Sequence, residues 1–257
     1  MKQELFRKLP QWFLDISPND FYLVLTNDMD SYFSCRILTK YTGVAIGGFY
    51  SFDRGLYVDE NYTNGKEPIY VDLGVTSGKA FDNHYTFIQN PEIVNPNIIK
   101  RQYFQKYNGG TLALVASLFD HMEQFTEYQW MTILSVDSFY YGYYNRGGSF
   151  RNINLYWFDE LGITEYVVPI LEKNTESTFQ QFISDEKLNE SIKMNSSGEL
   201  ICKKHLELPD RKFRLVQEID KRFVSEEEAL EIYRQYGDNI VVSNEAYLDR
   251  YVLNLKK

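Results

Sequence analysis

Short apolar runs alternate with segments of helical spacing through the first half of the chain. Residues 22–25 form an apolar run that stops abruptly at the polar pair Thr26 and Asn27, and residues 32–38 then place apolar side chains at helical spacing. An alternation of strands and helices favours a parallel sheet that is covered by helices on both faces. The pattern therefore predicts an α/β fold whose further strands lie within residues 44–52, 69–74 and 79–81.

The pattern changes near residue 165. Residues 166–170 are expected to form a strand or a linker, and residues 175–193 a long polar helix. Alternating apolar and polar residues are typical of half-exposed strands, and they occur at 199–208 and 212–219. Residues 239–243 and 246–255 are expected to form closing strands. We therefore expect an α/β domain over residues 1–164 and a smaller α+β domain, with a substrate-binding or accessory role, over residues 165–257.

Composition and charge limit the classes of partner. The 257 residues suffice for a well-buried core. A net charge of −9 disfavours long nucleic acid as the main partner, because proteins that bind the phosphate backbone are normally basic. Two cysteines far apart in sequence provide neither a disulfide framework nor a zinc cluster. With no signal-peptide or membrane-span pattern, we expect a cytoplasmic protein that does not bind membranes.

Carboxylates follow the apolar segments of the first half. Because parallel strands present their carboxyl ends at one edge of a sheet, these loops are expected to converge. Carboxylates held close together repel each other unless a cation or a proton lies between them. A carboxylate-rich cluster with one imidazole suits Mn²⁺ or Mg²⁺, and a pair of such ions can activate water against a phosphoryl group. The residues concerned are Asp28 with Asp30, Asp72, Asp82 with His84, and Asp137.

The same segments resemble a known family. The DHH phosphoesterase superfamily has four motifs that are similar in order and spacing to TNDMDSYFSCRIL, YVDLG, FDNHYT and LSVDSF in this chain. That superfamily includes RecJ-type exonucleases, nanoRNA and cyclic-dinucleotide phosphodiesterases, and manganese pyrophosphatases. The resemblance covers roughly residues 20–150 and implies a parallel-sheet domain that binds Mn²⁺, followed by a domain that holds the substrate.

The resemblance implies a role for each matching residue. The metal ligands would bind one or two Mn²⁺ or Mg²⁺ ions, with Asp72 as the aspartate that bridges the two. The Asp82–His84 segment matches the signature Asp-His-His, so Asp82 and His84 are expected to be catalytic. The implied metal ligands are Asp28, Asp30, Asp72, Asn83 and Asp137.

The chain departs from the family pattern at several points. Asn83 replaces a metal-ligand histidine, and Val24 and Thr26 occupy the expected positions of a further ligand. The Gly-Gly-Gly-His signature of many members is missing. Fewer ligands could mean one metal ion, a different ion, or none. Singly, Asp72 or Asp137 could cap a turn or a helix, and His84 could be a structural histidine.

Two functions therefore remain open. One is a metal-dependent phosphoesterase that hydrolyses a phosphodiester or phosphoanhydride in a short oligonucleotide, a dinucleotide or a small phosphate compound. The other is a binding or interaction protein that retains the fold with an incomplete metal site. Arg146 and Arg151 flank a Gly-Gly-Ser loop that could hold the substrate phosphate, although a solvated surface loop is an equal alternative. The pattern does not determine the oligomeric state.

Overall fold

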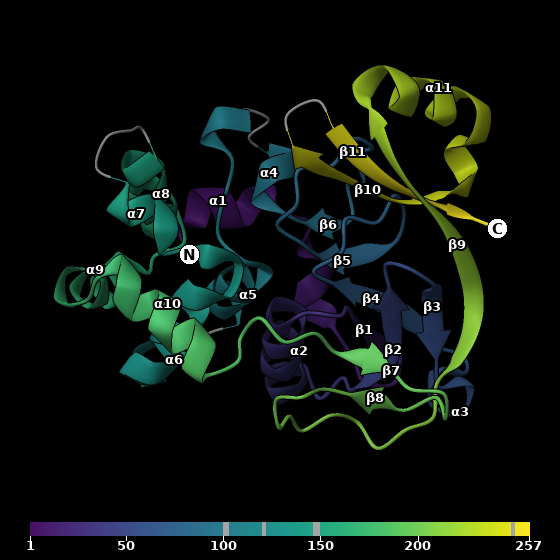
Figure 1. The fold of residues 1–257 in the computed structure, drawn as a ribbon, viewed down its shortest axis with the longest axis horizontal. Helices are drawn as coiled ribbons and strands as arrows, with labels where there is room; N and C mark the ends of the chain where they lie inside the picture. The colour runs from purple at the N-terminus through teal and green to yellow at the C-terminus, as the bar shows by residue number, and fades with distance from the viewer. Residues whose placement is uncertain (100–102, 120–121, 146–149, 248–249) are drawn as a thin grey trace.

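The computed structural model describes residues 1–99, 103–119, 122–145, 150–247 and 250–257. Within these residues, nine strands form one sheet in the order β10-β11-β9-β3-β2-β1-β4-β5-β6 (Figure 1). A separate antiparallel pair consists of β7 (Lys193–Met194) and β8 (Leu200–Ile201). The strands of the large sheet are β1 (Phe21–Leu25), β2 (Ile46–Ser51), β3 (Gly55–Val58), β4 (Glu67–Val71), β5 (Lys79–Phe81), β6 (Ile93–Val94), β9 (Arg214–Ser225), β10 (Ile240–Tyr247) and β11 (Arg250–Lys256).

The parallel half of the sheet contains β2, β1, β4, β5 and β6. Successive side chains of a strand point to opposite faces. Leu23 and Leu25 accordingly pack in one core with Leu38 of the following helix, whereas Tyr22 and Val24 pack in a second core on the other face. Burial on both faces explains why this strand reads as a continuous apolar run.

Most of the helices form one group on one side of the sheet, whereas the helix near the C-terminus lies apart, beside β9 and β11 (Figure 1). The first long helix, α2, begins after its N-cap Asp28 and ends at Gly43, whose φ of 74° is the left-handed conformation expected of a C-terminal glycine. The helices are α1 (Gln3–Lys8), α2 (Met29–Thr42), α3 (Glu60–Thr63), α4 (Pro96–Ile99), α5 (Thr111–Leu118), α6 (Glu127–Ser135), α7 (Tyr141–Tyr144), α8 (Phe150–Glu160), α9 (Thr164–Lys173), α10 (Glu176–Asp185) and α11 (Glu226–Tyr236).

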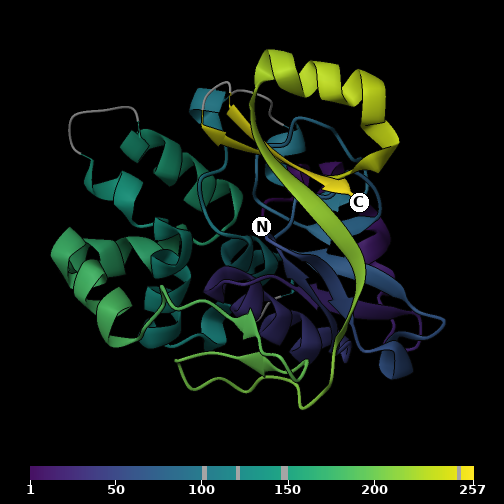
Figure 2. The same ribbon diagram turned by 45° about the vertical axis from the view of Figure 1, so that its right-hand side comes forward.

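The C-terminal strands extend and curl the sheet. Strand β9 pairs with β3 on one side and with β11 on the other, and it spans the edge of the molecule (Figures 1 and 2). Isolated bridges join Val75 to Val242 and Thr86 to Asn244, so β10 lies against the loops that follow β4 and β5. The predicted fold class is confirmed: a curled α/β sheet with a parallel half is flanked by helices, and the C-terminal region is smaller and rich in strands.

Several details of the C-terminal prediction are wrong. Residues 166–170 lie inside helix α9, where buried Val167, Ile170 and Leu171 have helical spacing despite the β-branched residues and Pro169. The polar helix ends at Asp185, and only Leu200–Ile201 of the 199–208 segment is a strand. Local β propensity was overridden by packing against the helical group.

The proposed boundary between residues 164 and 165 stays a prediction. Side chains and strands from the two sides of this boundary contact each other. Phe179 and Phe182 of α10 pack against Tyr140 and Tyr128, which lie before the boundary, and β9 joins the main sheet through β3. Among the described residues, no helix combines the length and apolar character needed to cross a membrane. Cys35 and Cys202 are free thiols, the first buried and the second half-buried.

Candidate metal centre

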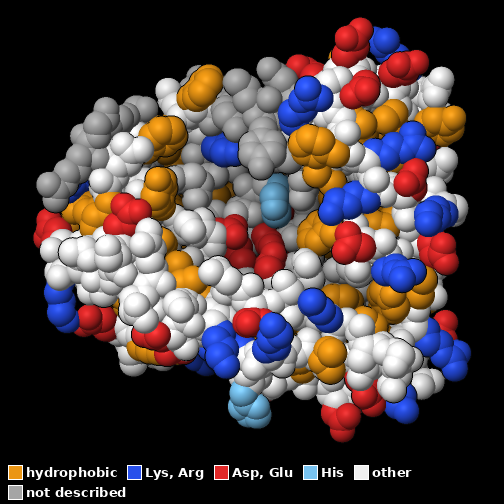
Figure 3. Space-filling view, in the orientation of Figure 1, with side chains coloured by type: hydrophobic (Ala, Val, Ile, Leu, Met, Phe, Trp, Pro, Cys, Tyr) orange, Lys and Arg blue, Asp and Glu red, His pale blue; other side chains and the backbone are white. Residues whose placement is uncertain are grey.

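The loops after β1, β4 and β5 converge with the turn after α6, as the sequence pattern predicts. Their side chains form two groups, and within each group the candidate ligand atoms all lie within 4.8 Å of one another. One group contains Asp72, Asp82 and His84, and the other contains Asp30, Asp72 and Asp137. Asp72 belongs to both groups. The space-filling view shows acidic side chains beside a histidine at the bottom of a central hollow (Figure 3).

Asp28 and Asp30 are positioned by the start of α2. The Asp28 carboxylate accepts a hydrogen bond from the Ser31 N–H (3.0 Å), which makes it the N-cap of the helix. Asp30 is 2% exposed, and its two oxygens accept hydrogen bonds from the backbone N–H groups of Thr111 and Leu112, each at 2.6 Å. Asp30 therefore also caps the N-terminus of α5, where unpaired N–H groups favour a negative charge.

The glycine before α5 explains this close approach. A Cβ atom at Gly110 would lie 2.8 Å from Oδ2 of Asp30, so a side chain there would collide with the carboxylate. Gly110 is the N-cap of the helix, and Thr111 is its first residue. Thr111 directs its hydroxyl to Asp72, with an Oγ1–Oδ1 distance of 2.9 Å.

Asp72 lies where the backbone leaves β4. Its φ of 61° is in the left-handed region, which residues other than glycine adopt infrequently. The residue is 2% exposed, and Oδ1 of its carboxylate lies 4.0 Å from Nδ1 of His84. Burial raises the pKa of Asp72 well above its ordinary value, and the Asp28 carboxylate raises it further. A buried carboxylate with a raised pKa is stabilised by a bound proton or by a cation.

Asp82 and His84 form a hydrogen-bonded pair beside Asp72. Asp82 is fully buried, and its Oδ1 lies 2.6 Å from Nδ1 of His84. The other oxygen accepts hydrogen bonds from the His84 backbone N–H (3.2 Å) and from Nδ2 of Asn95 (3.0 Å). Burial lowers the pKa of His84, but the carboxylates of Asp82 and Asp72 outweigh this effect and raise it to about 10. The imidazole is thus held as a cation or as an Nδ1–H donor.

Asn83 and Asp137 contact each other. Nδ2 of Asn83 donates to Oδ2 of Asp137 (2.8 Å) and to the Gly109 carbonyl (2.9 Å), while its Oδ1 lies 3.4 Å from the Thr111 hydroxyl. Asp137 is exposed and has a φ of 54°. In this orientation the Asn83 amide nitrogen, rather than the oxygen, faces the acidic group.

The donor set fits a hard or intermediate divalent cation. Burial also raises the pKa values of Asp28 and Asp30, and the Asp137 carboxylate adds to both shifts. Several carboxylates with one imidazole leave the site short of positive charge. Carboxylate oxygens and one imidazole nitrogen are ligands that Mn²⁺ and Mg²⁺ accept, and a carboxylate that accepts one hydrogen bond per oxygen retains lone pairs for a metal.

A cavity of about 320 Å³ opens at the acidic group. It is lined by Asp28, Asp30 and Asp137 on one side and by residues 188–191 on the other. These residues join α10 to β7. A segment more than a hundred residues after Asp28 and Asp30 thus lies opposite their side chains. The amino-acid pattern does not reveal this cover.

Strand β10 forms backbone hydrogen bonds with two of the acidic loops. The Ser243 N–H donates to the Gly74 carbonyl (3.2 Å), and the Glu245 N–H donates to the Tyr85 carbonyl (2.7 Å). A Cβ atom at Gly74 would lie only 2.1 Å from Oδ1 of Asn244. Strand β10 therefore packs directly on the loops that carry Asp72 and His84.

Of the two predicted phosphate-binding arginines, the structure describes Arg151. Arg146 lies outside the described residues. Nη2 of Arg151 donates to the Tyr143 hydroxyl (2.9 Å), and the guanidinium packs over that ring at 4.3 Å. Phosphate binding by these arginines stays a prediction. Two other cations, Arg54 and Lys193, line a cavity beside the acidic group, and no spacing signal connects them in the sequence.

Comparison with known proteins gives no identification. No family model, no curated protein and no solved structure matches the chain. The interpretation of the site therefore depends on its geometry and on the motifs themselves.

Proposed function

We propose that the protein is a divalent-metal-dependent phosphoesterase of the DHH type, using Mn²⁺ or Mg²⁺. Its substrate is a phosphodiester or phosphoanhydride in a short oligonucleotide, a dinucleotide or a small phosphate compound. The observation that carries the proposal is that Asp72 is shared by two groups of candidate ligands. A carboxylate shared by two ligand groups suits two metal ions held close together.

The residues of the site have different roles in this reaction. Asp28, Asp30, Asp72 and Asp137 bind the cation, which would lower the pKa of a water molecule and offset phosphoryl charge. Asp82 holds His84 through Nδ1 at 2.6 Å. The His84 side chain is 31% exposed, and its imidazole donates a proton to the leaving oxygen of the substrate. Asn83 orients Asp137 through its amide N–H.

The test compares the wild-type protein with Asp72→Asn. Millimolar Mn²⁺ should raise the melting temperature of the wild type, because a ligand at 100 times its Kd stabilises the folded state by about 2.7 kcal/mol. The wild type should hydrolyse bis-p-nitrophenyl phosphate or a dinucleotide. Asp72→Asn should lose the metal-induced rise and at least about 100-fold in kcat/KM, since even outer partners of metal ligands contribute 10–100-fold.

Asp20→Asn is the matched control. Asp20 is an exposed aspartate in the turn before β1, so its substitution should leave metal binding and hydrolysis unchanged. A wild-type protein that shows neither metal-induced stabilisation nor hydrolysis of either substrate would contradict the proposal.

A second candidate is a non-catalytic binding protein that retains the fold. Both oxygens of Asp30 accept backbone N–H groups of α5, and Asn83 directs its N–H group to Asp137, so part of the cluster already has a structural role. This candidate predicts no change of melting temperature with Mn²⁺ and no hydrolysis. A cytoplasmic location and the exclusion of long nucleic acid as the main partner stay predictions, the second resting on the net charge of −9.

A further inference from the structure

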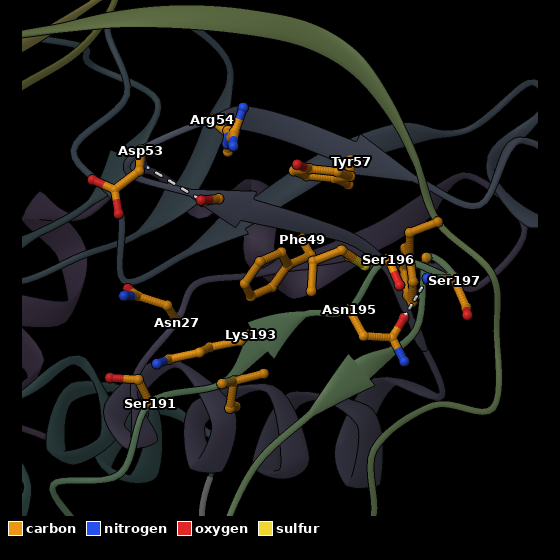
Figure 4. A pocket seen from close by; sticks show the side chains of 15 residues that line it. Asn27, Phe49, Asp53, Arg54, Tyr57, Ser191, Lys193, Asn195, Ser196 and Ser197 are labelled. Carbon is orange, nitrogen blue, oxygen red and sulfur yellow. Dashed lines mark hydrogen bonds between the residues drawn. The ribbon is translucent and has the colours of Figure 1, made fainter.

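A second cavity, of about 830 Å³, lies next to the acidic cavity. One wall comes from β2, β3 and the turn between them, and the other from residues 191–198 (Figure 4). Ser191 lines both cavities. The Ile192 N–H donates to the Asn27 carbonyl (2.8 Å), immediately before Asp28. The two cavities therefore adjoin at Ser191, and we call the larger one the groove.

Two cations lie along this groove. Among the described residues, no ion pair is recorded for Arg54 or Lys193, and both side chains are exposed. Asp53, on the same rim, lies 3.7 Å from Lys221, so it is already paired. Figure 4 shows the Lys193 side chain running toward Asn27 and Ser191, which mark the acidic end. Unpaired cations in a protein of net charge −9 indicate a site for an anion.

Aromatic and amide side chains also line the groove, together with several serines. Phe49 is buried and forms part of the floor, and the half-buried Tyr57 ring lies 6.4 Å from it between centroids. Asn27 and Asn195 add amide groups to the walls. A cavity with an aromatic surface and a few polar groups suits a flat ring with hydrogen-bonding edges.

We propose that this groove binds the nucleoside phosphate end of the substrate. The nucleobase packs against Tyr57, and a phosphate lies between Arg54 and Lys193, with the scissile bond directed toward Asp28 and Asp137. This assignment rests on the proposed function, because it names the substrate class of the same site: nucleotides and short oligonucleotides, rather than compounds that consist of phosphate alone. This assignment gives the phosphate to Arg54 and Lys193, whereas the sequence pattern suggested Arg146 and Arg151.

The test measures equilibrium binding of AMP, adenosine and inorganic phosphate by titration calorimetry, in millimolar Mn²⁺ and again in EDTA. AMP should bind more tightly than either fragment. Arg54→Gln and Lys193→Gln should each weaken AMP binding by about fivefold or more, because each loses a charge-assisted contact. Lys40→Gln, which removes an exposed lysine of α2 outside the groove, is the matched control and should bind AMP as the wild type does.

The ring is tested separately. Tyr57→Phe keeps the aromatic face and should retain AMP affinity, whereas Tyr57→Ser should lose about fivefold or more, since base stacking contributes substantially per base. Melting temperatures show whether each variant is folded. If Tyr57→Ser does not fold, the Arg54 and Lys193 variants still test the proposal, because both residues are exposed and their substitution should not disturb the fold.

The outcomes separate this inference from the proposed function. Weaker AMP binding in the groove variants, without hydrolysis by the wild type, would support the groove and contradict the phosphoesterase. Hydrolysis that depends on Asp72, with AMP affinity and KM within twofold of wild type in Arg54→Gln and Lys193→Gln, would overturn the groove alone. Inorganic phosphate bound as tightly as AMP, or no AMP binding by the wild type at millimolar concentration, would also overturn it.

Discussion

The loops after β1 and β4 both end a buried parallel strand in a carboxylate, yet they support that carboxylate differently. Asp30, after β1, lies in the first turn of α2 and accepts two backbone N–H groups of α5 at 2.6 Å. Asp72, after β4, has a left-handed backbone conformation and accepts the Thr111 hydroxyl. Both are 2% exposed. Burial raises the pKa of both carboxyls, but the N–H groups of α5 offset part of the cost of a charge at Asp30, so a cation or a proton matters more at Asp72.

The sharpest test of this comparison is the stability of two isosteric variants in EDTA. Asp30→Asn loses charge-assisted hydrogen bonds and turns an amide N–H toward another donor, so it should lower the free energy of unfolding by about 2–3 kcal/mol. Asp72→Asn removes a buried charge with a raised pKa, so stability should be unchanged or higher. Urea unfolding measures both. Equal losses in the two variants would remove the distinction between the loops.

A second test concerns the support of the β4 loop by β10. Gly74→Ala would place a Cβ atom 2.1 Å from Oδ1 of Asn244 and 2.7 Å from Thr86. Such overpacking should cost about 1–3 kcal/mol and weaken Mn²⁺ binding through displacement of Asp72. Gly65→Ala is a control with an open surrounding and a φ of 75°, so it should cost only about 1 kcal/mol of backbone strain. If Gly74→Ala changes only stability and leaves Mn²⁺ affinity intact, β10 does not position the site.

The smallest expected effect is the pH dependence of stability without metal. The folded pKa values of Asp28, Asp30 and Asp72 are raised, so the protons they bind stabilise the folded state at acid pH, and this contribution is lost as the pH rises through the raised values. His84 acts in the same direction: its contribution is complete below its ordinary value of 6.5 and is lost as the pH rises through about 10.

In EDTA, the free energy of unfolding should therefore fall between about pH 5 and pH 9, by an amount on the order of 1 kcal/mol. The lowered pKa values of Glu186 and Glu228 act below this range, because their stabilisation is complete above the ordinary carboxyl pKa and is lost as the pH falls through the lowered values. Thermal unfolding across this range measures the trend. Asp72→Asn should flatten it, and a wild-type protein whose stability rises toward pH 9 would contradict the assignment of buried, protonated acids.

The sequence predicted those parts of the molecule that depend on neighbouring residues. The apolar runs of β1, β4 and β5, the helical spacing of α2 and the acids that follow the strands are all signalled within a few positions. The error at residues 166–170 has a physical cause, since β-branched residues and a proline favour a strand locally, whereas burial of Val167, Ile170 and Leu171 on one side favours the helix that forms. The hydroxyl of Thr111 bonds Asp72 of a distant loop, a contact that neighbouring residues do not signal.

By itself, the sequence determined that parallel strands end in carboxylates, because periodicity and strand-end chemistry are encoded locally. Only the tertiary structure decided that Asp72 belongs to two ligand groups, that Asp30 caps α5, and that β10 packs on Gly74. Arg54 and Lys193 line the same cavity although they lie 139 residues apart in the sequence. Such contacts depend on how a distant segment returns to the sheet, and no local pattern of apolar and polar residues specifies that return.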